Sequence, residues 1–393
     1  MNFYAGIALL LLACIGNSAW WAIFVNRTHS LRYHADSLRY VRKVHDAGIL
    51  LFPPVAFWFL GWADSGLLRG GSVTEFSAVR QGTLLLALSG LVPFTWSVVR
   101  WQVRRAPVEL HKATSVHFDV PGKEAGTSTG DLAQGNRVPL LARFPKNEVH
   151  RLEVTRKWLC LTERPARDGH ESRKIKVAHF SDTHFTGYPG RHYFEFATDQ
   201  LCELQPDIFV FTGDLLDNEA LLPWASEMFS RLVTVAPGYS ILGNHDWHLN
   251  HSRIRRGLIE TGWMDIGGQH RTVSIGDATV LLAGTEAPWI GTNPGVPESA
   301  SEDLRILLSH SPDQRDYAQR QQFDLMLCGH NHGGQVVLPV IGPVYAPSKY
   351  GVKYAGGTYR YRQMLMHVSR GLSGQEALRL NCCPEVTLLE VEF

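Results

Sequence analysis

The chain has 393 residues, a length that suits more than one folded unit at roughly 150 residues per domain. Its 38 basic and 37 acidic residues leave no charge excess of the kind that attracts nucleic acid, so no nucleic-acid partner is expected. The six cysteines form no CxxC pair and no regular spacing. This pattern argues against a thiolate zinc site or a disulfide framework and agrees with a reducing compartment.

The first part of the chain contains three long apolar runs, at residues 3–25, 47–63 and 82–101. The first carries no charge, and at about 1.5 Å per residue it can span a hydrocarbon core of roughly 30 Å. A cleaved signal peptide is the alternative, but the basic residues expected at the start of such a peptide are missing. Pro53 and Pro54 interrupt the second run, which is therefore either a kinked span or a re-entrant hairpin. The sequence favours three spans, with two as the alternative.

Basic residues are unevenly distributed between the loops that join these runs. Those between the first and second runs are Arg27, Arg32, Arg39, Arg42 and Lys43. The loop between the second and third runs has only Arg69 and Arg80. Because cytoplasmic loops carry an excess of Lys and Arg, three spans predict an outside N-terminus and a cytoplasmic soluble part. We expect an integral protein of an inner or plasma membrane, in contact with membrane lipid; loss of the second span would reverse the side.

Three regions are expected along the chain. Residues 1–106 form the transmembrane region, 107–148 a linker, and 149–393 a soluble domain. The linker mixes polar residues with several glycines and shows no sustained period, so it is a linker with a short strand or two, or else a mobile lid. The soluble domain is expected to begin with an edge strand at 149–161. From residue 174 strands and helices alternate, with helices at 194–204 and 219–232, which is typical of an α/β sheet domain.

Five short apolar runs in the soluble domain end directly in residues that can bind metals. The runs are 175–180, 208–211, 239–242, 304–308 and 324–328. The residues that follow them are Asp182 and His184, Asp214 and Asp217, Asn244 to Asp246, His310, and His330 and His332. In open α/β sheets ligands bind beyond the carboxyl ends of the strands, so these residues are expected to converge on one site. A buried acid such as Asp214 is costly unless it is paired or bound to a cation.

The side chains in these motifs suit a divalent metal. Imidazole, carboxylate and amide groups without thiolates favour Mn, Fe, Zn or Mg, and they disfavour a purely structural zinc site. One Asp-x-His pair is weak evidence, because it occurs by chance. The ordered series DxH, GDxxD, GNHD, H and GHxH is far more specific. From about residue 174 to the C-terminus this series resembles the calcineurin-like metallophosphoesterases.

This resemblance implies a fold, a metal centre and a reaction. The fold would be α/β, a pair of packed β-sheets flanked by helices, here preceded by the transmembrane helical region. The centre would hold two divalent metal ions, with manganese favoured. One ion would be bound by Asp182, His184 and His332 and the other by Asn244, His310 and His330, with Asp214 bridging the two. A water shared by two cations roughly 3.5 to 4 Å apart loses a proton at neutral pH, and the bridging hydroxide would hydrolyse a phosphoester or pyrophosphate bond.

Other residues near the motifs are candidates for catalysis, ligand orientation and substrate binding. His245 matches no ligand position, so it is expected to protonate the leaving oxygen or to stabilise the transition state, with Asp246 orienting or charging its imidazole. Asp217 either hydrogen-bonds a ligand or caps the next helix. His248 and His251 either touch a substrate phosphate or belong to a polar surface loop. Arg370 and Arg379 either bind a phosphate or form salt bridges.

The C-terminal stretch from Gly333 to Glu385 resembles a membrane-attached branch of this superfamily. That branch includes transmembrane proteins with a phosphoesterase domain and a UDP-2,3-diacylglucosamine pyrophosphatase of lipid A synthesis. The resemblance implies a phosphorylated small-molecule or lipid-linked substrate, and no protein partner is inferred. The soluble pyrophosphatase of that pathway carries Arg where this chain has His245, so the motifs alone do not transfer its substrate. The alternative function is a catalytically inactive metal-binding scaffold or sensor, although no ligand is missing at a matched position.

Overall fold

The computed structural model describes residues 1–104, 106–107, 109–120, 139–161, 172–298, 302–374 and 376–393. The chain divides into two compact units. The helical unit consists of Met1–Arg104 and Pro339–Lys353, and the sheet unit consists of Arg105–Leu338 and Tyr354–Phe393. Most of the expected linker, residues 121–138, lies outside the described residues.

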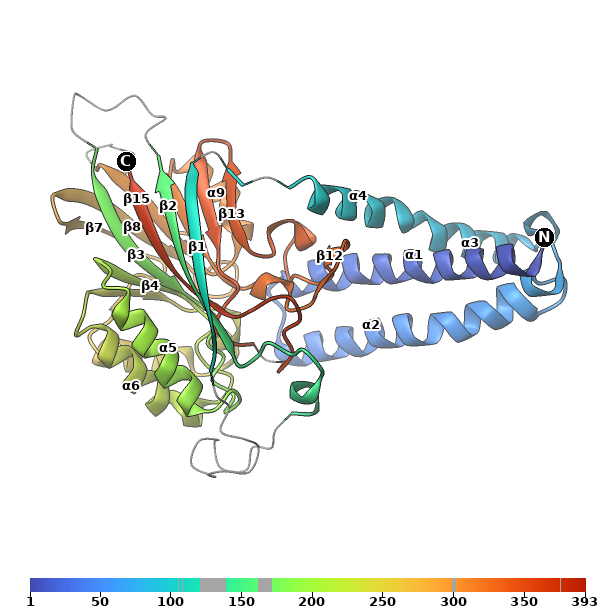
Figure 1. Cartoon of the computed structure of the whole chain (residues 1–393), viewed down its shortest axis with the longest axis horizontal. Helices are drawn as coiled ribbons and strands as arrows, with labels where there is room; N and C mark the ends of the chain where they lie inside the picture. The colour runs from blue at the N-terminus through green and yellow to red at the C-terminus, as the bar shows by residue number, and fades with distance from the viewer. Residues whose placement is uncertain (105, 108, 121–138, 162–171, 299–301, 375) are drawn as a thin grey trace. The chain divides into compact units, whose positions relative to one another are not determined.

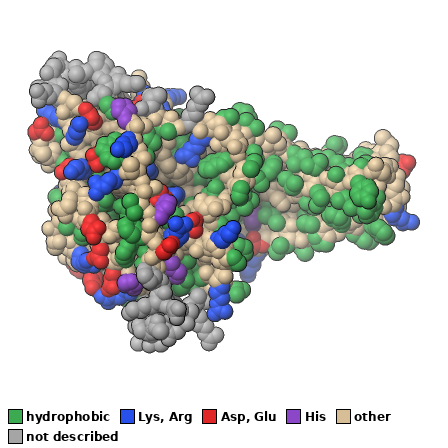
Figure 2. All heavy atoms as spheres, in the orientation of Figure 1, with side chains coloured by type: hydrophobic (Ala, Val, Ile, Leu, Met, Phe, Trp, Pro, Cys, Tyr) green, Lys and Arg blue, Asp and Glu red, His purple; other side chains and the backbone are tan. Residues whose placement is uncertain are grey.

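The helical unit contains the three candidate membrane spans that the apolar runs predict. Its long helices are α1 (Phe3–His29), α2 (Ala35–Ala56), the π-helical η1 (Phe57–Trp62), α3 (Ala78–Ser89) and α4 (Leu91–Gln102). Three stretches are long and apolar enough to cross a membrane, namely Phe3–His29, Ala35–Trp62 and Ala78–Gln102. Figure 2 shows a nearly continuous apolar surface on these helices, whereas charged side chains are spread over the sheet unit.

Local sequence explains how these spans begin, continue and pack. Asn2 caps α1, because its Oδ1 accepts the Ala5 N–H at 2.8 Å. Pro53 and Pro54 lie inside α2, and the chain passes into the π-helical η1 instead of turning back. The second run is therefore one continuous stretch and not a re-entrant hairpin. Gly90 joins α3 to α4, and a Cβ there would lie only 2.0 Å from the Gly16 oxygen of α1.

The sheet unit contains two large mixed sheets (Figure 1). In spatial order, the first sheet is β1 (Leu110–Asp119), β2 (Arg151–Cys160), β15 (Glu385–Glu392), β3 (Lys174–Phe180), β4 (Ile208–Thr212), β5 (Gly238–Ile241) and β6 (Met264–Asp265). The second is β13 (Gly357–Tyr361), β14 (Met364–Val368), β10 (Leu325–Cys328), β9 (Leu304–Ser309), β8 (Ala278–Thr285) and β7 (His270–Ile275). A small sheet pairs β11 (Val337–Leu338) with β12 (Gly342–Pro343).

Helices and short turns complete the two units. The helices of the sheet unit are α5 (Arg191–Glu203), α6 (Leu222–Leu232), α7 (Asn244–His248), α8 (His251–Glu260) and α9 (Arg315–Arg320). The 3-10 turns are η2 (Leu67–Arg69), η3 (Val73–Glu75), η4 (Leu140–Arg143), η6 (Glu219–Leu221), η7 (Pro312–Gln314), η8 (His332–Gly334) and η9 (Gly351–Tyr354). The two helices predicted from the sequence correspond to α5 and to η6 with α6.

Strand β4 shows why the predicted strands read as continuous apolar runs. Phe209 and Phe211 belong to a core that also includes residues of α5, α6 and α8. Ile208 and Val210 point the other way, into a core shared with strands of the second sheet. Because both faces of the first sheet are covered, successive residues of β4 are all buried. Helices α5 and α6 lie side by side on its outer face (Figure 1).

The edge-strand prediction for residues 149–161 is wrong. Strand β2 occupies this stretch, but it is an inner strand, paired antiparallel with β1 and parallel with β15. Strand β1 lies within the range expected to be a linker and forms the edge instead. The central strands β3, β4 and β5 are parallel to one another, as are β8, β9, β10 and β14. Their carboxyl ends therefore present their following loops together.

Candidate metal centre

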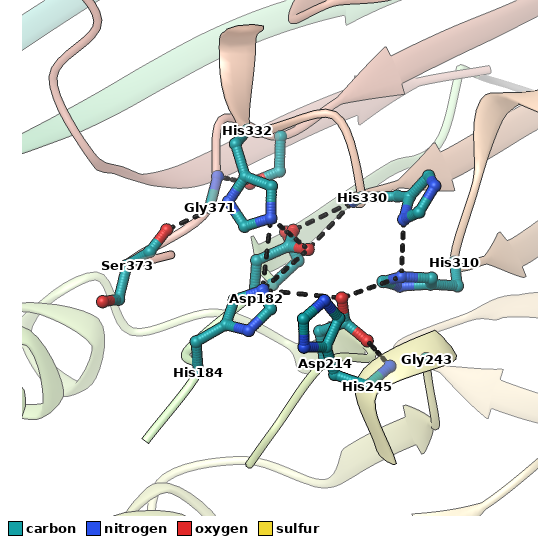
Figure 3. A network of polar contacts seen from close by, with 12 residues as sticks. Asp182, His184, Asp214, Gly243, His245, His310, His330, His332, Gly371 and Ser373 are labelled. Carbon is teal, nitrogen blue, oxygen red and sulfur yellow. Dashed lines mark hydrogen bonds and ion pairs between the residues drawn. The ribbon is translucent and has the colours of Figure 1, made fainter. Parts of the chain in front are cut away.

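The loops that follow β3, β4, β5, β9 and β10 carry the candidate ligands expected from the sequence. The residues that these loops bring together are Asp182, His184, Asp214, Asn244, His310, His330 and His332. Asp182, His184 and His310 have no exposed surface, and Asp214 is only 1% exposed. Among the described residues, two groups of ligand atoms share Asp214 and lie one on each side of it (Figure 3).

The first group consists of Asp182, His184, His332 and Asp214. His184 Nε2 lies 3.2 Å from His332 Nε2 and 3.5 Å from Asp214 Oδ2. His332 Nε2 lies 3.6 Å from Asp182 Oδ1. Two atoms bound to one ion at about 2.1 Å, with an angle near 90 to 110°, are about 3 to 3.5 Å apart. The group therefore has the spacing of a divalent-metal site.

The second group consists of Asp214, His310 and His330, with Asn244 beside them. His310 Nε2 is its central atom. It lies 3.2 Å from Asp214 Oδ2, 3.1 Å from His330 Nδ1 and 2.9 Å from Asn244 Oδ1. This donor set mixes imidazole, carboxylate and amide oxygen, which suits a borderline or hard divalent ion. Asp214 Oδ2 takes part in both groups.

The hydrogen bonds of the histidines leave lone pairs facing one another. The Nδ1 atom of His184 contacts Asp217 Oδ2 at 2.9 Å, and that of His332 contacts the Ser373 carbonyl at 3.0 Å. These acceptors require Nδ1–H donors, so each neutral ring presents an unprotonated Nε2 toward the other. Such atoms repel unless a proton or a cation lies between them. The donor arrangement therefore fits a bound metal ion.

Asp214 gives a second, independent indication of a cation. Within the described part of the chain its buried Oδ2 forms no hydrogen bond, although the two ligand groups meet at this atom. An unsatisfied carboxylate oxygen in the interior is costly without a positive partner. Burial lowers the pKa of His310, but Asp214 and Asp182 outweigh burial and raise that pKa to about 9. The two carboxylates therefore stabilise a positive charge at this position.

The backbone at the ligands is held in an uncommon conformation. The residues with left-handed φ values are Asp182 (52°), His184 (39°), Asp214 (58°), His330 (70°) and His332 (48°). Only a few per cent of non-glycine residues adopt such values, and they concentrate at functional sites. Glycines allow the loops to approach: a Cβ on Gly243 would lie 2.1 Å from Asp214 Oδ1. One on Gly329 would lie 2.3 Å from Asp182 Oδ2.

Asp217 lies between a candidate metal ligand and His245. Its Oδ2 contacts His184 Nδ1, and its Oδ1 contacts His245 Nδ1 at 2.5 Å. Burial raises the pKa of Asp217, but His245 and His184 outweigh burial and lower it. Asn218, rather than Asp217, caps the following turn, because its side chain accepts the Ala220 N–H. Of the two interpretations offered by the sequence, the structure therefore supports the ligand contact.

Asp246 does not contact the His245 imidazole, contrary to the expected orienting role. Its carboxylate accepts backbone N–H groups of Leu215 and Leu216 and, at 2.9 Å, that of Gly243. Asp246 therefore joins the loops that follow β4 and β5. Burial lowers the pKa of His245, but Asp217 and Asp214 outweigh burial and raise it to about 10, with a smaller contribution from Asp246. A cation bound at Asp214 would oppose part of this rise.

The arginines considered as phosphate ligands have other partners. Arg370 pairs with Glu153 and Glu385 at 2.5 and 2.7 Å. Arg379 is 1% exposed and donates to the carbonyls of His332 and Arg370 at 2.8 and 2.7 Å. Their contacts are therefore internal to the protein. His248 lies with its ring centroid 6.3 Å from that of His245, and His251 begins α8.

Trp289 is a residue of the site that sequence reasoning missed. It is 2% exposed, and its ring packs against His310 and His330 with centroids 5.5 and 4.9 Å away. It lies in the loop after β8, whose carboxyl end is at the same edge as those of β9 and β10. The apolar run of β8 was available in the sequence, but no ligand-type motif follows it directly.

Comparisons with known proteins show the family to which this chain is similar. A family model described as calcineurin-like phosphoesterase matches residues 175–334. Phosphodiesterase YaeI of Escherichia coli (strain K12) is 30% identical, over 55% of this chain and 82% of that protein. UDP-2,3-diacylglucosamine pyrophosphatase LpxG of Chlamydia trachomatis serovar D is 22% identical, over 55% of this chain and 83% of that protein. A transmembrane protein with metallophosphoesterase domain from Danio rerio is 24% identical, over 41% of each chain.

Proposed function

This chain belongs to the calcineurin-like phosphoesterase family and is a metal-dependent phosphoester hydrolase, and from that premise we propose a catalytic centre of two divalent ions. Asp182, His184 and His332 would bind one ion, Asn244, His310 and His330 would bind the other, and Asp214 would be shared by both. The observation that carries this proposal is Asp214 Oδ2, a buried oxygen without a hydrogen bond at which both ligand groups meet. Manganese is the ion that we propose to test first.

Some groups of the site would bind the ions, and others orient the side chains that bind them. Divalent ions held there supply Lewis acidity toward the phosphoryl oxygens and an activated water as the nucleophile. Asp217 and the Ser373 carbonyl hold His184 and His332 in the tautomers that present Nε2 to the site. The Thr212 carbonyl does the same for His310, whose Nδ1 lies 2.7 Å away. The ligands are thereby preorganised before substrate arrives.

His245 is the proposed proton donor to the leaving oxygen. Its Nδ1 contacts Asp217, so the proton on Nε2 is the one available for transfer. Its ring packs against His184 with centroids 4.5 Å apart, which keeps it beside the ligand groups. Its side chain is 23% exposed, in contrast to the fully buried His184. Asp217 stabilises the imidazolium form, and in this proposal it replaces Asp246 as the orienting carboxylate.

The proposed substrate is a phosphodiester or pyrophosphate, with a lipid-linked compound such as UDP-2,3-diacylglucosamine as the specific candidate. Likeness to the Chlamydia pyrophosphatase and the three candidate membrane spans support this choice. A site attached to the bilayer would meet a poorly soluble substrate by diffusion in two dimensions. We propose that the catalytic part lies on the cytoplasmic side, because Arg27, Arg32, Arg39, Arg42 and Lys43 lie between the first two apolar runs.

The test is product release by the full chain purified in detergent with Mn²⁺. Bis-p-nitrophenyl phosphate and UDP-2,3-diacylglucosamine are assayed in parallel, and bound metal is counted by elemental analysis. Asp214→Asn should abolish turnover and lower the metal content. Asp277→Asn is the matched control, because the Asp277 side chain is 82% exposed. It should leave both quantities unchanged.

Each outcome has a distinct meaning. Release of UMP from the lipid nucleotide, lost in Asp214→Asn, establishes a lipid pyrophosphatase. Turnover of only the generic diester keeps the metal mechanism and rejects the lipid nucleotide. Metal binding without turnover of either compound favours the inactive scaffold or sensor.

A further inference from the structure

The segment Pro339–Lys353 follows the metal-ligand loop in sequence but belongs to the helical unit. It starts seven residues after His332, so the chain cannot separate these positions by more than about 25 Å. Part of the segment is buried, including Gly342, Ala346 and Ser348, while Val340 is 69% exposed. The segment is therefore packed on the helices on one side and open on the other.

The end of α1 provides a polar partner for this segment. Asn26 is 4% exposed, and its Oδ1 accepts the Ala346 N–H at 3.0 Å. A buried amide near the end of a membrane helix is costly unless it is hydrogen-bonded, and here the partner is the segment's backbone. The His29 ring meets the Tyr345 ring edge to face, with centroids 6.2 Å apart. The end of α1 therefore binds the segment through a hydrogen bond and a ring contact.

The end of α4 holds the beginning of the same segment. Gly342 has φ +87°, and a Cβ there would lie 2.6 Å from Trp101 Cγ, so only glycine allows the backbone to approach the indole. Gln102 donates its side-chain amide to the Val340 carbonyl. Both contacts are made by the final two residues of a candidate membrane span, Ala78–Gln102.

These contacts place the segment at a membrane boundary. The candidate spans Phe3–His29 and Ala78–Gln102 both end where the segment is attached. Trp and Tyr side chains favour this boundary, because their rings are amphipathic. Trp101, Tyr345 and the half-buried Tyr350 supply such rings here.

The exposed side of the segment is apolar at Val340, although the backbone conformation at this position disfavours valine. Val340 has φ +67°, a conformation that is strained for a β-branched residue and that Gly or Asn would adopt readily. Its side chain is nevertheless 69% exposed, and the nearby Val344 is 39% exposed. A valine kept at a strained and exposed position, with a second exposed valine nearby, is explained if lipid at a membrane boundary covers both side chains.

The charges near these valines favour an anionic leaflet. The segment contains Lys349 and Lys353, both exposed. Five more basic residues lie around the same end of α1. Arg27 is in the last turn of α1, Arg32 is in the connection to α2, and the first half of α2 contains Arg39, Arg42 and Lys43. Each basic residue close to an anionic membrane surface contributes about 1 kcal/mol of attraction.

We propose that Pro339–Lys353 is an interfacial element that inserts Val340 and Val344 among the headgroups of an anionic leaflet. It thereby selects, as substrate class, a phosphoester carried by an amphiphile in that leaflet. This inference rests on the proposed phosphoesterase function, and it adds that the substrate is taken from the leaflet. The segment is linked to the candidate metal centre through the chain itself, because only a few residues join it to the His332 loop.

The activity test compares two diesters with the same leaving group. Full-length protein in vesicles of phosphatidylcholine and phosphatidylglycerol is given bis-p-nitrophenyl phosphate in solution or phosphatidyl-p-nitrophenol in the bilayer. The double variant Val340→Asn with Val344→Asn should lower the rate on the bilayer diester about tenfold and leave the soluble diester within twofold. Asn tolerates the left-handed conformation at 340, so folding is preserved. The control is Val116→Asn on β1, where the valine is 57% exposed.

A second measurement does not depend on activity. Benzoylphenylalanine is placed at 340 or at 116, the vesicles are irradiated, and lipid adducts are detected by mass spectrometry. We expect lipid adducts from position 340 and none from position 116. Adducts at 340 without turnover of either diester would support the membrane contact while rejecting the phosphoesterase function.

Two results overturn the inference and leave the phosphoesterase function intact. One is an equal rate loss on both diesters, or no loss on either, in the double variant of an active protein. The other is the absence of lipid adducts at position 340.

Discussion

Two aspartates of the site, Asp217 and Asp246, bind different kinds of partner. Asp246 follows His245 directly, yet its carboxylate accepts backbone N–H groups, including that of Leu215. Asp217 is distant in sequence and meets His245 at 2.5 Å. Adjacent residues on the short helix α7 point in different directions, so adjacency in sequence did not predict contact. The two residues therefore make different experimental predictions.

Replacing Asp217 should reduce catalysis much more than stability. Asp217→Asn retains the size of the side chain but removes the charge that stabilises His245 imidazolium and holds the His184 tautomer. We expect kcat to fall by about 10² or more, the usual contribution of a general acid, with a small change in unfolding free energy. Steady-state kinetics on a soluble diester, with urea unfolding alongside, measures both. A normal kcat would show that Asp217 has no part in the reaction.

Replacing Asp246 should reduce stability. Asp246→Ala leaves the buried N–H groups of Leu215, Leu216 and Gly243 without their acceptor. A lost partner costs about 1 to 3 kcal/mol for each buried group, so we expect a loss of about 3 kcal/mol or more. Asp246→Asn keeps an acceptor oxygen and should lose less. Urea denaturation of both variants tests this order, and equal stability of Asp246→Ala and the native chain would contradict it.

At the scale of elements, the sequence predicted the ligand-bearing strands well and their neighbours poorly. Strands β3, β4, β5, β9 and β10 match the predicted runs within about two residues. Each is a short apolar run followed at once by a motif, and both features are local. The position of β15 between β2 and β3 depends on pairing between residues far apart in sequence, which local patterns do not encode. The same reason explains why the edge-strand prediction for β2 is wrong.

The packing of the segment Pro339–Lys353 is a second feature that local sequence patterns did not predict. The sequence predicts one soluble domain over residues 149–393, whereas this segment packs with the helices of residues 1–104. Its partners, Asn26 and Trp101, lie more than 200 residues earlier. Neither its composition nor its period differs from that of an ordinary loop, so no pattern in the sequence indicated this packing.

The ion pair that joins β2 to β15 gives a prediction for acid stability. Arg370 contacts Glu153 of β2 and Glu385 of β15. Burial raises the pKa of Glu385, but Arg370 and Lys157 outweigh burial and lower it to about 2 from an ordinary 4.5. Because the folded-state pKa is the lower one, this stabilisation is present above about pH 4.5 and is lost as the pH falls toward 2. The full effect is about 3 kcal/mol.

Unfolding free energies at pH 6 and pH 3 test this prediction. Glu385→Gln should be less stable than the native chain at pH 6, and its stability should fall less between the two pH values. Glu260→Gln, at an exposed position of α8, should follow the native chain. A Glu385→Gln variant with the native pH dependence would show that other groups control acid unfolding.

At the scale of the whole molecule, the metal centre connects loops from both large sheets. Asp182 and Asp214 follow strands of the first sheet, and His310 and His330 follow strands of the second. Ions bound at the proposed centre would therefore cross-link the two layers of the sheet unit. Anything that binds only the folded state stabilises it, by about 4 kcal/mol at a thousand times the dissociation constant.

Removing metal should lower the unfolding temperature of the sheet unit. We expect chelator to shift the calorimetric transition of the native chain downward, and added Mn²⁺ to restore it. Asp214→Asn should show a smaller shift, because the residue shared by both ligand groups is altered. An identical transition with and without chelator would mean that the ions contribute nothing to folding.

The place of β15 also has a consequence for the order of events during synthesis. Residues 385–392 fill the position between β2 and β3, which leave the ribosome long before them. At about 5 to 20 residues per second, the delay after β3 is roughly ten to forty seconds. During this time the apolar helices have already emerged, while two inner strands still have unpaired edges. The nascent protein is therefore most exposed to aggregation and proteolysis after membrane insertion begins and before its first sheet closes.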